Sequence, residues 1–195
     1  MIMGAMIFAK KLLDDDALIM LPQVRIPGSH ANRLGLIRKG LVSVIDSGPI
    51  LHFHHCSFED FLLSTFFLQE LSEFSAVQDQ GYHEHQLAVL CLKTLVSPSL
   101  YFNMGNLDSS SIKNVNIDVK STISPLMSYS SLFWVNHLIQ TPSDEKMMKA
   151  VKFVMYEQLL FWLEVMSLTG NVHAAYLILR RAATWKVCLQ VISLQ

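Results

Sequence analysis

The last third of the chain constrains its fold most strongly, because it divides into four successive helix-length segments. These segments cover residues 124–139, 143–154, 156–170 and 171–185. Asp144 and Glu145 suit the first turn of a helix, and Gly170 suits the position just after one. Helices joined by connections this short pack as neighbours. The sequence therefore predicts a helical bundle or a short α-solenoid in this region.

The beginning of the chain shows a different pattern of shorter elements. Asp14 offers an N-cap before an acidic first turn, and a second short helix is expected between Ser29 and Gly40. Two short apolar runs, residues 41–45 and 50–54, then flank the turn sequence DSGP, which is a hairpin signal. Short helices followed by a small hairpin are the order of a winged-helix domain.

Together these patterns predict a mainly α fold with two domains. Residues 1–70 are expected to form a winged-helix-like domain with a small β-hairpin, and residues 71–195 a helical domain. A helix is expected over residues 85–96, and residues 97–120 are expected to form a long loop. Six aromatic residues of the helical domain recur at helical spacing and are expected in its core rather than in a ligand cage. They are Phe133, Trp134, Phe153, Tyr156, Phe161 and Trp162.

The composition limits the possible partners. Hydrophobic residues make up 51% of the chain and charged residues only 16%, which favours an apolar surface that meets a protein partner. The formal net charge is −1. The basic pairs Arg38-Lys39 and Arg180-Arg181 are expected as helix C-terminal cations. Without a dense basic patch, no nucleic-acid partner is expected.

The composition also predicts the compartment. The three cysteines are odd in number and widely spaced, as in proteins of reducing compartments. The uncharged run over residues 121–143 carries several serines with Asn136, His137 and Gln140, so no membrane span is expected. The apolar opening has its lysines after it rather than before it, unlike a secretory signal. A cytoplasmic protein is predicted.

The densest candidate chemistry is HFHHC, residues 52–56. On a strand His52 and His54 would share a face. With His83 and His85 they could supply four imidazoles for zinc, and Cys56 could replace one. This spacing matches no known closed site, and the second histidine pair is predicted about thirty residues away at a loop-to-helix entry. An exposed polar strand face is the preferred interpretation, and no metal is expected.

The sequence also argues against catalysis. A nucleophile at Cys56 would use His55 as base, but neighbours on a strand point in opposite directions, and no G-x-S-x-G is present. No Gly-Lys dipeptide occurs, so there is no phosphate-binding G-x-x-x-x-G-K-[ST]. The chain is therefore expected not to be an enzyme. Glu157 and Glu164 lie seven residues apart and are expected on a solvated helix edge.

After the histidines the chain becomes helical, with Ser57 and Asp60 in the positions of a capping box. The stretch FHHCSFEDFLL resembles the end of the winged-helix domain of NACHT-type STAND NTPases, and of the large fungal NACHT family in particular. The residues that match are His55, Ser57, Phe58, Asp60, Phe61 and Leu62. The resemblance extends to GLIRKGLVSVIDSGP, HEHQLAVLCLKTLV, LFWVNHLIQTPSDE and LLFWLEVMSLTG, and covers the chain to about Trp185.

The resemblance implies a function for one residue. In such proteins a P-loop core precedes the winged helix, whose histidine contacts the β-phosphate of ADP, and a helical region leads on to sensor repeats. Only His55 corresponds to that histidine. Because the P-loop motif is missing here, the chain is expected to be a non-catalytic, signal-transmitting piece of such a protein, with no cofactor of its own. ADP or ATP would bind only with an intact NTPase core.

Three alternatives remain at this point. The first is a stand-alone interaction module that pairs with full-length NACHT relatives through apolar surface. The second is a winged-helix nucleic-acid binder, for which the expected recognition helix offers only Arg33, Arg38 and Lys39. The third is a zinc-dependent enzyme built on the histidine cluster.

Overall fold

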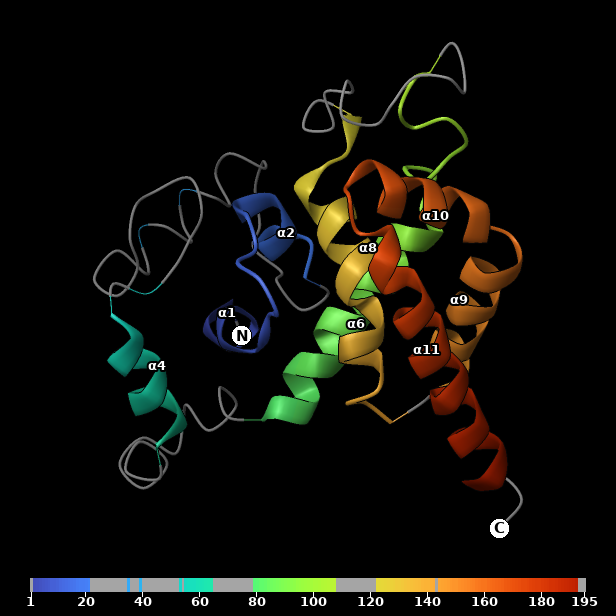
Figure 1. Ribbon diagram of the computed structural model, residues 1–195. Helices are drawn as coiled ribbons and strands as arrows, with labels where there is room; N and C mark the ends of the chain where they lie inside the picture. Colours follow the sequence, from blue (N-terminus) through green and yellow to red (C-terminus); the bar gives the residue numbers. More distant parts are fainter. Residues whose placement is uncertain are drawn as a thin grey trace. The chain divides into compact units, whose positions relative to one another are not determined.

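The computed structural model describes residues 2–21, 53, 55–64, 79–107, 122–142 and 144–192, with the isolated positions 35 and 39 (Figure 1). The described residues are mainly helical, as predicted. They contain no β-strand, only single bridge residues at Asp14 and Phe53. The predicted hairpin lies almost entirely outside the described residues, which therefore give no support to a winged-helix-like arrangement.

The chain divides into two compact units, Met1–Leu87 and Ala88–Gln195. The division falls inside helix α6 (Gln80–Val96). The predicted domain boundary after residue 70 lies outside the described residues and stays a prediction. None of the described helices has the length and apolar character needed to span a membrane.

The first unit contains three short helices and the start of α6. They are α1 (Ile2–Phe8), α2 (Asp15–Ile19) and α4 (Cys56–Leu63). The predicted N-cap at Asp14 is confirmed, since its carboxylate accepts a hydrogen bond from the Ala17 N–H at 2.9 Å. Leu62 of α4 is buried, with Ile7, Phe53 and Phe58 packed against it.

Helix α1 lies close to the first turn of α6. The Phe8 ring stacks on the His83 imidazole with centroids 5.6 Å apart. A β-carbon on Gly4 would overlap the same imidazole. Glycine at position 4 thus permits the close approach of the two helices.

Helix α6 begins five residues earlier than predicted. The Asp79 carboxylate accepts a hydrogen bond from the Tyr82 N–H at 2.9 Å and so caps the first turn. His83 and His85 therefore lie within a helix, and the prediction of a loop-to-helix entry there is wrong.

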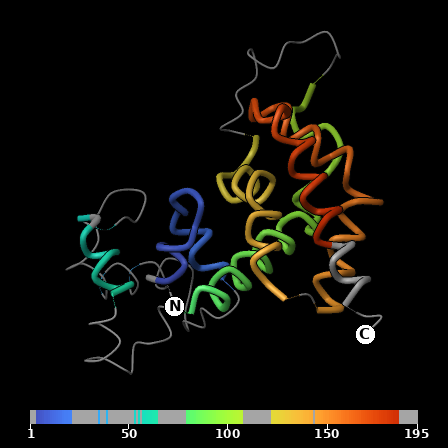
Figure 2. The backbone as a smooth tube through the Cα atoms, turned by 60° about the horizontal axis from the view of Figure 1, so that its bottom comes forward, coloured from blue at the N-terminus to red at the C-terminus, as the bar shows by residue number. Residues whose placement is uncertain are grey.

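The second unit contains the four predicted helices. They are α8 (Pro125–Leu138), α9 (Glu145–Tyr156), α10 (Leu159–Leu168) and α11 (Val172–Ile192). Helix α10 packs against α8, α9 and α11, and α11 also packs against α8 (Figure 2). Each helix starts within three residues of its predicted start, and side-chain caps mark the starts of α8 and α9.

Local chemistry explains these helix ends. Ser124 accepts a hydrogen bond from the Met127 N–H at 3.1 Å before α8, and Asp144 accepts one from the Met147 N–H at 2.7 Å before α9. Gly170 follows α10 with φ of +74°, which confirms its predicted role. The prediction that Arg180 and Arg181 end a helix is wrong, because α11 continues to Ile192.

Two tryptophans form the centre of the second unit. Trp134 and Trp162 are fully buried, as predicted. The Trp162 indole N–H donates to the Ser131 carbonyl at 2.9 Å. The same prediction is wrong for Phe153 and Tyr156, whose side chains are exposed on α9.

Candidate functional site

His55 is the N-cap of α4. Its backbone is extended, with φ of −144° and ψ of 137°, and its Nδ1 accepts a hydrogen bond from the Ser57 N–H at 3.1 Å. The same Nδ1 lies 2.6 Å from the Ser57 hydroxyl oxygen. The predicted capping box of Ser57 and Asp60 is therefore wrong, because the imidazole of His55 takes the place of the usual capping oxygen.

This contact decides which nitrogen of the ring carries the proton. A ring nitrogen that accepts the Ser57 N–H cannot itself be protonated, so the neutral imidazole carries its proton on Nε2. Nε2–H is then a hydrogen-bond donor on an exposed side chain at the start of an eight-residue helix. The arrangement suits a hydrogen bond to an anionic oxygen.

The charges around His55 oppose binding of a free anion. Glu59 lies in the first turn of α4, and the exposed Asp60 follows it. Carboxylates at these positions satisfy the positive end of the helix dipole and repel a second negative group. Within α4 there is no lysine or arginine to offset them. A phosphate at Nε2 would need positive charge from elsewhere.

Phe58 and Leu62, which belong to the same NACHT-like motif as His55, hold α4 in place by packing. Phe58 contacts Phe53, with ring centroids 5.5 Å apart, and packs against the buried Leu62. The rings of Phe58 and Phe61 have centroids 6.2 Å apart. Phe58 and Leu62 thus anchor α4, the helix that His55 caps.

The described residues contain no metal-binding cluster of the kind that the zinc alternative requires. Among the described residues, no three histidine, cysteine, aspartate or glutamate side chains lie close enough to hold an ion. His83 is buried, stacked on Phe8 and edge-on to Tyr82. His52 and His54 lie outside the described residues, as does the side chain of Cys56.

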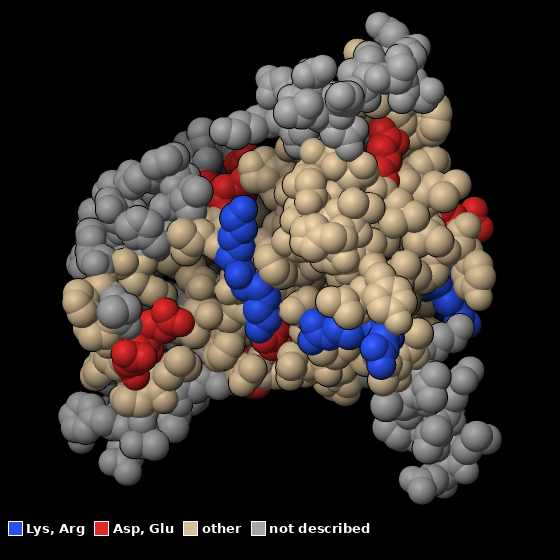
Figure 3. All heavy atoms as spheres, in the orientation of Figure 1, with Lys and Arg blue, Asp and Glu red and all other residues tan. Residues whose placement is uncertain are grey.

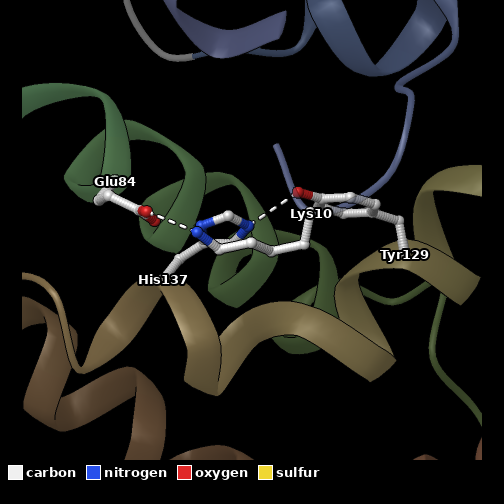
Figure 4. A network of polar contacts seen from close by, with 4 residues as sticks. All are labelled: Lys10, Glu84, Tyr129 and His137. Carbon is white, nitrogen blue, oxygen red and sulfur yellow. Dashed lines mark hydrogen bonds and ion pairs between the residues drawn. The ribbon is translucent and has the colours of Figure 1, made fainter. Parts of the chain in front are cut away.

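Sequence reasoning missed an ion pair of the first unit that joins an exposed lysine to a buried carboxylate. Lys10 Nζ lies 2.8 Å from the Glu84 carboxylate, which is fully buried (Figure 4). In the same turn of α6, partial burial and the Asp79 carboxylate raise the pKa of the Tyr82 hydroxyl. Tyr82 thus stays protonated at physiological pH.

The second unit has a buried polar pair of its own. The Tyr129 hydroxyl and His137 Nε2, two turns apart on α8, lie 2.7 Å from each other (Figure 4). Both side chains are buried. An imidazole and a phenol can exchange a proton, but their burial in the helix core points to a structural hydrogen bond rather than to catalysis.

Glu164 fixes the loop that follows α6. Its carboxylate accepts hydrogen bonds from the Asn103 N–H at 3.0 Å and the Gly105 N–H at 3.2 Å. Asn103 has a left-handed φ of 59°, and its side chain accepts the Leu107 N–H at 2.8 Å. The prediction of a solvated edge is therefore wrong for Glu164, whereas Glu157 is exposed.

Comparison with known proteins gives no relative. The chain matches no family model, no curated protein and no solved structure.

Proposed function

We propose that this chain is a non-catalytic, signal-transmitting part of a NACHT-type STAND NTPase. The observation that carries the proposal is His55, which caps α4 through Nδ1 and presents Nε2–H as a donor. In this role His55 contacts a phosphate of ADP held by an NTPase core. The chain has no cofactor of its own and acts in the cytoplasm.

The charges of α4 explain why a core is required. A P-loop surrounds phosphates with backbone N–H groups and a lysine, which supply the positive field that α4 lacks. Glu59 and Asp60 disfavour a nucleotide on this chain alone. His55 then adds one hydrogen bond to a phosphate that the core already binds.

Packing provides a route from the nucleotide to the rest of the first unit. Leu62 anchors α4 among Ile7, Phe53 and Phe58. A change in the position of His55 shifts α4, and α4 moves its core contacts with it. Loss of the phosphate contact thus displaces residues that do not contact the nucleotide.

The test uses the chain together with a separately purified NACHT NTPase core. We expect His55→Ala to weaken ADP binding by the mixture roughly tenfold, the value of one hydrogen bond to a charged group. His55→Asn is the matched control for capping, because asparagine caps helices well but offers no Nε2–H. It should restore the stability of α4 without restoring ADP affinity. Equal ADP affinity in all three proteins would contradict the phosphate contact.

A stand-alone interaction module is the second candidate. It is favoured by the large apolar side chains exposed on the second unit, among them Phe102, Tyr156 and Leu160, each about three-quarters exposed. A module of this kind would bind a full-length NACHT relative equally well with and without ADP. Binding that depends on ADP and on His55 would instead support the first candidate.

A further inference from the structure

The cap of α4 differs in chemistry from the caps of the other helices. Asp14, Ser124 and Asp144 cap α2, α8 and α9 through oxygen atoms, which keep their lone pairs at physiological pH. His55 caps α4 through Nδ1, which accepts the Ser57 N–H at 3.1 Å. A ring nitrogen accepts a hydrogen bond only while it carries no proton. The cap of α4 therefore depends on the charge of the imidazole.

The Ser57 hydroxyl offers the charged ring a different hydrogen bond. Its Oγ lies 2.6 Å from the same Nδ1. With the ring neutral, Nδ1 accepts from both the hydroxyl and the backbone N–H of Ser57. With the ring charged, Nδ1–H donates to the hydroxyl oxygen, and the backbone N–H loses its acceptor. This N–H belongs to the first turn of α4, where no carbonyl of the helix can replace the lost partner.

The surroundings of His55 allow its ring to gain a proton. The side chain is exposed, and the charged residues of α4 are Glu59 and Asp60. Figure 3 shows acidic and no basic side chains over α4 on the face that it presents. Ile7 of α1 and Phe53, which pack against α4, are uncharged, and α1 contains no ionisable side chain. Among these elements the charged groups thus oppose an imidazolium in sign and stabilise it.

We propose that His55 makes the start of α4 a pH-sensitive switch. A histidine side chain is ordinarily half protonated at about pH 6.5, so its charge changes within the physiological range. Above this titration the ring is neutral and caps the helix. As the pH falls through it, Nδ1 takes up a proton and releases the Ser57 N–H to solvent. The positive ring also lies at the positive end of the helix dipole, which weakens the first turn further.

The switch is a property of the chain alone. It requires neither an NTPase core nor a nucleotide, so it stands or fails independently of the proposed function.

Amide hydrogen exchange of the full chain, followed by NMR, tests the switch. Protection factors, corrected for the intrinsic effect of pH on exchange, are compared about one pH unit above and one below pH 6.5. Protection of the Ser57 amide should fall roughly threefold to tenfold at the lower pH, the value of one hydrogen bond. The Met147 amide is the internal control, because a carboxylate oxygen of Asp144 caps it. Its protection should change by less than roughly twofold, since aspartate stays ionised over this range.

Two variants separate the switch from a general effect of pH. His55→Asn caps through an oxygen that does not titrate, so the Ser57 amide should be equally protected at both pH values. His173→Asn removes an exposed histidine of the second unit and should keep the wild-type response. Circular dichroism of each variant checks that the helices are retained.

Three results would overturn the proposal. One is a wild-type Ser57 amide whose protection is the same at both pH values. Another is a fall of equal size in His55→Asn. The third is a fall that the Met147 amide shares.

Discussion

At the scale of single residues, Gly4 is the described glycine whose added β-carbon would meet the closest contacts. The β-carbon in Gly4→Ala would overlap the His83 ring, so the His83 side chain or α1 must shift. We expect a loss of about 1–3 kcal/mol in the free energy of unfolding, measured with urea. Gly81→Ala in α6 is the control, because its new β-carbon meets only the Asp79 carboxylate, at 3.5 Å. It should be neutral or stabilise by up to about 1 kcal/mol. Equal changes in the free energy of unfolding for Gly4→Ala and Gly81→Ala would contradict the close approach of α1 and α6.

Tyr129 gives a second prediction at this scale. Tyr129→Phe removes the hydroxyl that meets His137 Nε2 and leaves that buried nitrogen without this hydrogen bond. The expected cost is about 1–3 kcal/mol in the same urea experiment. Tyr176→Phe removes a hydroxyl from a side chain that is 68% exposed and should change stability by less than about 0.5 kcal/mol. If the two substitutions cost the same, the buried pair contributes nothing.

At the scale of elements, the loop held by Glu164 can be tested without disturbing the helices. Glu164→Gln keeps one acceptor oxygen for the two amides of Asn103 and Gly105 and removes the charge. We expect a loss of about 1–2 kcal/mol and faster hydrogen exchange at those two amides. Glu157→Gln, on an exposed carboxylate, should change neither. Unchanged exchange at both amides in Glu164→Gln would show that the carboxylate does not fix the loop.

The helices also show what could be predicted from the sequence. Local chemistry predicted one end each of two helices of the second unit: Gly170 follows α10 as expected, and Asp144, expected in the first turn of α9, is its N-cap. The start of α4 was misassigned because histidine is an unusual N-cap, and a serine two residues later matched the familiar pattern. The exposure of Tyr156 on α9 was not predicted, because helical spacing alone does not say which face of a helix is buried.

Contacts between distant residues could not be predicted at all. Lys10 and Glu84 lie 74 residues apart, and Asn103 and Glu164 lie 61 apart. No local pattern connects such pairs, because their distance depends on how whole helices pack. The assignment of His55 as a phosphate contact came from its sequence neighbours and the resemblance they carry, and it stays a prediction. Its role as the cap of α4 was not predicted.

At the scale of the whole molecule, each unit has its own core, and α6 belongs to both. The proposed function assigns the nucleotide contact to the first unit, through His55 and α4. Tyr176 and Leu177 belong to the second unit and are exposed. Replacing both with aspartate should therefore leave ADP binding in the presence of a core unchanged, as titration of that variant can show. A loss of ADP affinity in that variant would mean that the second unit also contributes to the nucleotide contact.

The role proposed for His55 is measured by titration calorimetry of ADP against three samples: the chain alone, the chain with a NACHT NTPase core, and the His55→Asn chain with that core. We expect no measurable heat of ADP binding for the chain alone, because α4 offers one donor among carboxylates. Adding the chain to the core should tighten ADP binding, and His55→Asn should abolish this gain. Micromolar ADP binding by the chain alone, or a gain in affinity that His55→Asn leaves intact, would contradict the proposed role of His55.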